Sequence, residues 1–336
     1  MTLLLASLLL STAPAPPAAV EVPLTFRTFR TWDVDLPAER FQPIGRALPL
    51  FGTDGLAVDV TEGGLAFDRD GDGSMDATVA PTDPEHPTRL LTFRLGERQH
   101  AVRVANNGRW EYAPAGAVEG KLGATRFLVF DQNGNGRFDD FGEDAMIVGR
   151  GKAAGFLSRT VLVDGALKDF TIAPDGSTAT LADHQGPTGS LDLGGELETK
   201  AKLRSVVLVD AERGNSFELS GSLAGAIDLP VGSYTLHSGE LVLGKSHAQL
   251  ATGRAAAIEV TDGGTTAVAW GGPVKAEFAY QRSGGQIQVG PQDIAYFGKA
   301  GEAYADFMPL GSSPEFTVKD RVTGEVLVDF VFPGNC

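Results

Sequence analysis

The chain has 336 residues, of which 42% are hydrophobic, and its 28 Lys and Arg against 43 Asp and Glu leave a net charge of −15. This length allows two or three domains, and the apolar content excludes a disordered protein. Because the chain is acidic and has no cluster of Lys and Arg along the sequence, we expect no nucleic-acid partner.

The N-terminal stretch is apolar from Leu3 to Leu10 and continues with small residues and prolines. This pattern resembles a secretory signal peptide, 1–19, cleaved near Ala19, although no Lys or Arg precedes the apolar run. We therefore expect a secreted, periplasmic or cell-surface protein. No other stretch is long enough to span a bilayer, so no transmembrane segment is expected. The single cysteine, Cys336, leaves no internal disulfide.

Two stretches of the first predicted domain, 20–186, match each other. Residues 65–76 read LAFDRDGDGSMD and residues 128–139 read LVFDQNGNGRFD. In each, an apolar alternating run leads directly into a loop rich in carboxylate and amide oxygens. The shared flank makes a common structural role more plausible than chance similarity of two turns.

The spacing suits Ca²⁺, which takes six to eight hard oxygen ligands, because side chains at alternate loop positions can converge on one point. The loops resemble the Asp-x-[Asp/Asn]-x-[Asp/Asn]-Gly loops of EF-hands, dockerins, thrombospondin type 3 repeats and integrin-type calcium blades. The resemblance implies side-chain ligands at Asp68, Asp70, Asp72, Asp76, Asp131, Asn133, Asn135 and Asp139, and backbone carbonyl ligands at Ser74 and Arg137.

The loops also depart from an EF-hand. The twelfth position, where an EF-hand carries a bidentate Glu, holds Val79 and Gly142, and the flanking helices are missing. Asp140, Glu143 or Asp144 could complete the second site, and Asp83 or Glu85 the first. Because Asp, Asn and Gly are also ordinary turn residues, two solvated turns without an ion remain the alternative.

The strand pattern predicts an all-β fold of two or three β-sandwich domains in tandem. Asp175-Gly176 and Gly284-Gly285 predict hairpins. Alternation predicts one buried face for 274–280 and another for Phe316 and Val318. Gly/Pro-rich breaks at 183–190 and 270–274 separate domains 20–186, 187–271 and 272–336, of which the last is a small Ig-like sandwich that could merge with its neighbour.

The second domain contains IDLPVGSYTLHSG, which resembles the Leu-Pro-x-Gly-x-Tyr-x-Leu signature of transthyretin-like or carboxypeptidase-regulatory-like sandwiches. The resemblance implies that Tyr234 packs inward, and it implies no activity. The adjoining GELVLGKS (239–246) matches a phosphate-loop pattern. However, Leu241 to Leu243 read as a strand and no βαβ unit surrounds them, so no nucleotide site is expected.

No catalytic motif stands out, since the five histidines are scattered and no nucleophile elbow occurs. We therefore expect an exported, non-catalytic calcium-binding protein with a structural or adhesive role and an unknown protein or glycan partner. A carbohydrate-binding module is the alternative, and a secreted hydrolase a more remote one. In a carbohydrate-binding module, the aromatic residues that stack on sugar rings would come from Trp32, Trp110, Trp270, Tyr112, Tyr296 and Tyr304.

Overall fold

The computed structural model describes residues 18–49, 55–95, 98–284, 286–288, 290, 293–307 and 315–331. Within these ranges the regular structure consists of β-strands and contains no α-helix, so the predicted all-β class is confirmed. Residues 1–17 of the expected signal peptide, and Cys336, lie outside the described residues.

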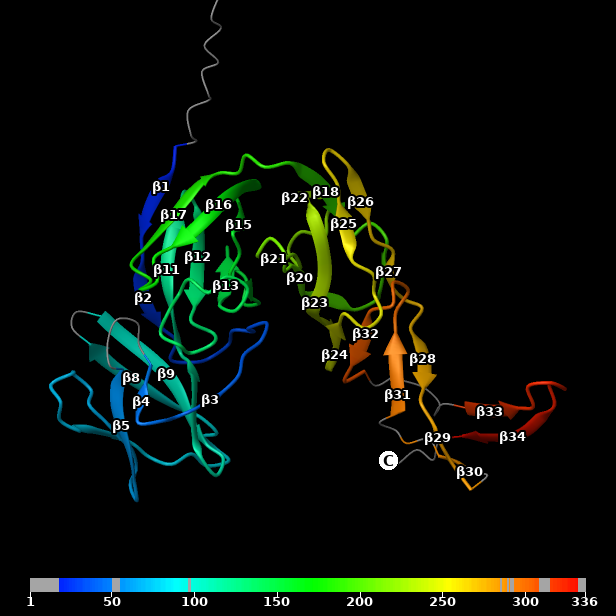
Figure 1. Ribbon diagram of the computed structural model, residues 1–336, viewed down its shortest axis with the longest axis horizontal. Helices are drawn as coiled ribbons and strands as arrows, with labels where there is room; N and C mark the ends of the chain where they lie inside the picture. Colours follow the sequence, from blue (N-terminus) through cyan, green and yellow to red (C-terminus); the bar gives the residue numbers. More distant parts are fainter. Residues whose placement is uncertain are drawn as a thin grey trace, which may run out of the picture.

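The first sandwich packs a sheet of order β1-β17-β16-β15 on a sheet of order β14-β13-β12-β11-β2 (Figure 1). Its inner core includes Phe127, Val129, Phe170 and Leu181. The outer face of the second sheet is covered by residues 29–36. The strands are β1 (Val20–Pro23), β2 (Thr25–Thr28), β11 (Gly116–Leu122), β12 (Thr125–Phe130), β13 (Ala145–Val148), β14 (Gly155–Phe156), β15 (Thr160–Val163), β16 (Ala166–Ile172) and β17 (Thr178–Asp183).

An inserted unit, residues 42–114, lies between β2 and β11, which pair with each other. It has its own core, in which Leu56, Leu65, Leu91 and Val104 are buried. Its two sheets have the orders β4-β5-β6-β7 and β3-β10-β9-β8. The strands are β3 (Gln42–Pro43), β4 (Ala47–Leu48), β5 (Leu56–Thr61), β6 (Gly64–Phe67), β7 (Ala77–Val79), β8 (Arg89–Leu95), β9 (Arg98–Asn106) and β10 (Trp110–Pro114).

The C-terminal unit is built around a sheet of order β21-β20-β23-β24-β32-β31-β28, in which β25 also pairs with β23. A smaller sheet, β22-β18-β26, shares its core. The strands are β18 (Thr188–Asp192), β19 (Leu197–Glu198), β20 (Lys202–Asp210), β21 (Asn215–Glu218), β22 (Ile227–Pro230), β23 (Gly232–Leu243), β24 (Ser246–Ala251), β25 (Ile258–Val260), β26 (Thr265–Ala267), β27 (Trp270–Gly271), β28 (Lys275–Phe278), β31 (Ile294–Phe297) and β32 (Ala303–Ala305).

Tyr234 is fully buried in this core, as expected, and its hydroxyl donates a hydrogen bond of 2.9 Å to the carbonyl of Pro230. The chain passes from one sheet to the other at Val231, between β22 and β23. Strands from both sides of the predicted break at 270–274 join the larger sheet.

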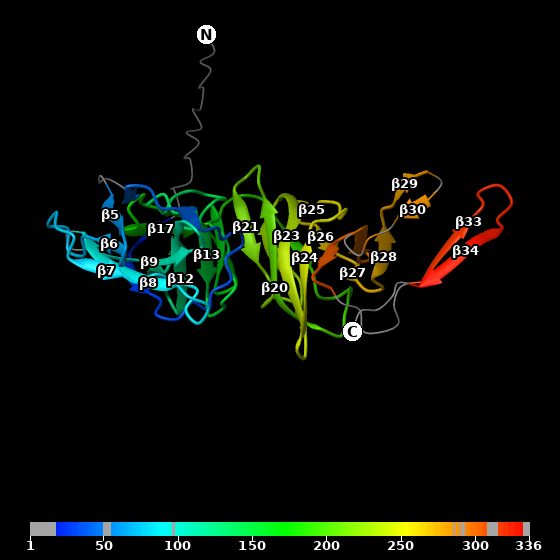
Figure 2. The same cartoon turned by 90° about the horizontal axis from the view of Figure 1, so that it is seen from below.

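The predicted hairpin at Asp175-Gly176 is confirmed by the pair β16–β17. The second predicted hairpin is formed by β29 (Gln281–Ser283) and β30 (Gln286–Gln288), and Gly285 lies outside the described residues. Phe316 is buried on β33 (Glu315–Lys319), as expected. This strand pairs with β34 (Val326–Val331), and the hairpin projects from one end of the elongated molecule (Figure 2).

The prediction that 274–280 buries one face is wrong for its strand. All four residues of β28 are exposed, and Phe278 keeps 49% of its surface accessible. Alternation distinguishes the two faces of a strand, but it does not show whether another layer covers either face. As the last strand of its sheet, β28 lies beyond the core.

Candidate metal centre in two acidic loops

The two acidic loops occupy equivalent places in different units. Loop 1 (68–76) connects β6 to its antiparallel neighbour β7 in the inserted unit, and loop 2 (131–144) connects β12 to β13 in the first sandwich. The Leu-x-Phe runs before them belong to two separate cores, since Phe67 and Phe130 are both buried. Core packing therefore explains the apolar flanks, but it does not explain the acidic residues of the loops.

The leading carboxylate of each loop accepts hydrogen bonds from backbone N–H groups further along. Asp68 accepts from Gly73 N at 2.8 Å, and Asp131 accepts from Gly136 N at 2.8 Å. Both glycines have positive φ, +93° and +83°, which a side chain would disfavour. The first carboxylate thus organises the same turn in both loops.

The match continues at the fifth position of each loop. Ser74 N donates to Asp72 Oδ1 at 2.7 Å, and Arg137 N donates to Asn135 Oδ1 at 2.8 Å. The two loops thus share a backbone conformation although they lie in different cores. Their sequence similarity reflects one local structure used twice.

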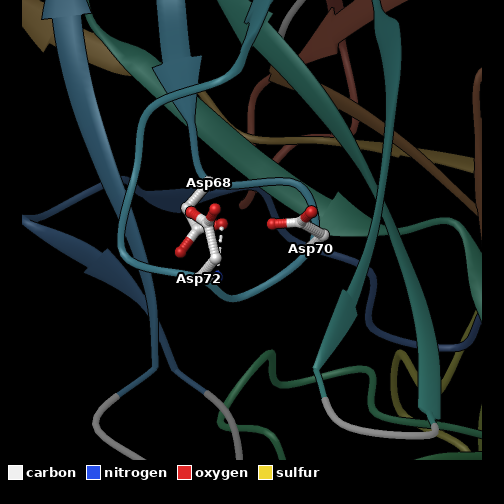
Figure 3. Close-up of side chains that lie close together, drawn as sticks. All are labelled: Asp68, Asp70 and Asp72. Atoms are coloured by element: carbon white, nitrogen blue, oxygen red, sulfur yellow. Dashed lines mark hydrogen bonds between the residues drawn. The ribbon is translucent and has the colours of Figure 1, made fainter.

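Loop 1 brings three carboxylates together. One oxygen from each of Asp68, Asp70 and Asp72 lies within 4.8 Å of the others. Asp70 points across the loop toward Asp68 and Asp72 (Figure 3). Asp68 is buried, whereas the other two are exposed. Like charges this close repel one another, so the arrangement favours a cation.

Asp68 is held in its ionised form, because the backbone N–H of Gly73, followed by those of Gly71 and Asp72, lowers the pKa of its carboxyl. Asp76 accepts a hydrogen bond from Arg69 N at 2.8 Å. Val79, at the twelfth position, has no side-chain oxygen and lies in the sheet, where it pairs with Leu65. Asp83 is engaged with Arg89 at 2.9 Å.

Loop 2 places its acids in a less polar environment. Burial raises the pKa of Asp131 to about 7, and burial together with the charge of Asp131 raises the pKa of Asp144 to about 9. Asp144 is fully buried and accepts hydrogen bonds from Gln132 N and Asp140 N, both at 3.2 Å. A proton or a bound cation would neutralise this pair.

Asp140 closes loop 2 over its two amides. Asn133 Nδ2 and Asn135 Nδ2 both donate to Asp140 Oδ2, at 3.0 and 2.5 Å. Asp139 is bound instead by the guanidinium of Arg137, at 2.9 and 2.8 Å. To bind an ion, Asp139 would first have to release Arg137. Among the described residues, only Asp68, Asp70 and Asp72 form a close group of three acidic side chains.

Loop 2 also contacts the inserted unit. The Tyr112 hydroxyl on β10 donates a hydrogen bond of 2.7 Å to the carbonyl of Gly134. A methyl group added at Gly134 would lie 3.1 Å from the Tyr112 ring. At Gly73, which corresponds to Gly136 of loop 2, an added methyl group would meet no atom within 4 Å. The Tyr112 contact thus ties loop 2 to the neighbouring unit.

The other motifs have structural roles. Residues 239–246 lie on the β23–β24 hairpin. Four of the six aromatic residues proposed for sugar stacking are buried, so they cannot form an exposed platform: Trp110, Trp270, Tyr112 and Tyr304.

Among the residues that the structure describes, no helix has the length and apolar character to span a membrane. No family model matches the chain, and no curated protein or solved structure is significantly similar to it.

Proposed function

We propose that the protein binds Ca²⁺ in its acidic loops, and that the bound ion stabilises an exported, non-catalytic β-protein with a structural or adhesive role at the cell surface or outside the cell. The convergence of Asp68, Asp70 and Asp72 within 4.8 Å carries the proposal. Carboxylate oxygens are the ligands that Ca²⁺ prefers, and its flexible coordination suits an irregular loop. Loop 2 would be a second site, with Asp131, Asp140 and Asp144 as its acids.

The role proposed for the ion is stabilisation. An ion present at ten to a hundred times its dissociation constant stabilises the native state by about 1.4 to 2.7 kcal/mol per site. This is a substantial fraction of the stability of a typical domain. Ion binding would matter most in the inserted unit, where loop 1 connects two short strands.

The test compares thermal unfolding in chelator and in millimolar Ca²⁺ for the wild type, for the double variant Asp70→Asn/Asp72→Asn, and for a control with the same charge change, Asp59→Asn/Asp262→Asn. Both control residues are exposed and lie outside the two loops. We expect Ca²⁺ to raise the melting temperature of the wild type and of the control by several degrees, and to raise that of the loop variant less.

The chelator arm distinguishes a cation site from a solvated turn. Without the ion, replacing Asp70 and Asp72 relieves repulsion, so the loop variant should be at least as stable as the wild type. Calcium should then reverse this order. If the order is the same in both buffers, or if Ca²⁺ leaves the wild type unchanged, the proposal is wrong.

A further inference from the structure

A groove of about 890 Å³ lies at one end of the first sandwich, on β11, β12 and the turn after β13. Its lining includes three cationic side chains, Lys121, Arg126 and Arg150. Within the described part of the chain, none of the three forms an ion pair, although acidic residues outnumber basic ones by 43 to 28. Their grouping is therefore unusual for this protein.

The fold places two of these cations directly opposite each other. Lys121 on β11 pairs with Arg126 on β12 in the antiparallel register. Side chains at such positions lie on the same face of the sheet with Cβ atoms about 5 Å apart, and like charges there are destabilising. An anion bound between them would turn this repulsion into attraction.

The same face is covered elsewhere by the protein itself. Ala117 and Leu128, further along β11 and β12, are buried beneath residues 29–36. Lys121 is exposed and lies outside that covered area. Gly149, whose N–H bonds to the carbonyl of Arg126 at 2.8 Å, has no side chain and leaves open space. The groove is thus the uncovered end of an otherwise covered face.

The two acids at the groove already have partners. Glu119 is paired with Arg27 at 3.1 Å, and the Asp164 carboxylate accepts a hydrogen bond from the Thr125 hydroxyl. Neither is bound to the three cations. The groove therefore retains positive groups that are free to bind a ligand.

We propose that this groove binds a small anion carrying two or more sulfate or phosphate groups. Lys121 and Arg126 would bind one group and Arg150 another. The volume lies within the range of small-molecule sites, and the net charge of −15 opposes the approach of a long polyanion. This site is separate from the acidic loops, so it does not depend on calcium.

The test is isothermal titration calorimetry at low ionic strength in chelator, with sucrose octasulfate and inositol hexakisphosphate as probes and sucrose as the uncharged control. The groove variant is Lys121→Gln/Arg126→Gln/Arg150→Gln. The matched variant, Lys202→Gln/Lys245→Gln/Arg282→Gln, makes the same charge change at exposed residues of the C-terminal half. Thermal melting shows that each variant is folded.

We expect saturable binding of at least one charged probe, and none of sucrose. The preferred probe distinguishes a sulfated from a phosphorylated ligand. Binding should weaken at least about a hundredfold in the groove variant, since three charge-assisted contacts are lost, and little in the matched variant. The absence of binding to either probe, or an equal loss in both variants, would overturn the proposal.

Discussion

Loop 1 and loop 2 share a backbone conformation, but the pKa values of their acids shift in opposite directions. In loop 1 the acids are mostly exposed, backbone donors lower the pKa of Asp68, and three carboxylates lie within 4.8 Å of one another. In loop 2 Asp144 is fully buried and Asp131 half-buried, and desolvation raises the pKa of both. One loop conformation can therefore present an ionised site or a partly protonated one, depending on its burial.

The largest expected effect comes from the buried acid of loop 2. Asp144→Ala removes the acceptors for one buried and one partly buried backbone N–H group, at a cost of about 1 to 3 kcal/mol each. Asp144→Asn keeps one of the two acceptor oxygens and should therefore cost less than Asp144→Ala. Urea unfolding measures both variants. Equal losses would show that these hydrogen bonds do not stabilise loop 2.

The second-largest effect is expected in the pH dependence of unfolding, to which the two loops contribute differently. Because the folded pKa values of Asp131 and Asp144 lie above the unfolded value of 3.8, the folded state holds extra protons above about pH 4. Stability therefore falls as pH rises from about 4, and the loss ends near pH 7 for Asp131 and near pH 9 for Asp144. We expect a loss of about 1.4 kcal/mol per pH unit for each proton difference, measured in chelator.

Asp68 contributes nothing to that slope. Its folded pKa is lowered, so its contribution is complete above the unfolded value and is lost only as pH falls through the folded one. His100, whose pKa burial lowers to about 4, acts between about 4 and 6.5, where its effect opposes that of the acids. A flat stability profile from pH 7 to 9 would contradict the assignment of buried acids to loop 2.

Glycine substitutions compare the packing of the two loops. Gly73→Ala introduces only the strain of a positive φ, about 1 kcal/mol. Gly134→Ala adds a close contact with Tyr112, so it should destabilise by roughly twice as much. Chemical denaturation in chelator checks the order. The reverse order would mean that Tyr112 does not restrain loop 2.

The smallest effect should follow from Arg137→Gln, which frees the carboxylate of Asp139 from its ion pair. Since this pair is partly exposed, the change should alter stability by less than about 1 kcal/mol. It should nevertheless tighten Ca²⁺ binding at loop 2, because a competing cation is removed. Calorimetry would show this change, with Arg254→Gln, which breaks the Arg254–Glu277 pair of the C-terminal unit, as a distant control.

Much of the local structure could be predicted from the sequence, because turns and alternation depend on neighbouring residues. The hairpin at Asp175-Gly176 and the buried Tyr234 are examples. The similarity of the two loops could also be predicted, since it lies in a continuous motif. The exposure of β28 could not be predicted, because it depends on the presence of a facing layer.

Parts of the candidate sites depend on how a loop folds or on which strands pair, and the sequence pattern does not show either. The pairing of Asp139 with Arg137, and the closure of Asp140 over two asparagines, depend on how loop 2 folds back. The basic groove combines Lys121 and Arg126 with Arg150, which adjoins them only because β13 pairs with β12. A count of charges along the chain does not detect such a grouping.

The insertion between β2 and β11 has a consequence for cooperativity. Gln42 pairs with Tyr112, so the inserted unit begins and ends at neighbouring points. The inserted unit can therefore unfold while β2 and β11 remain paired in the first sandwich. We therefore expect two unfolding transitions in calorimetry. Ca²⁺ binding at loop 1 should shift the transition of the inserted unit.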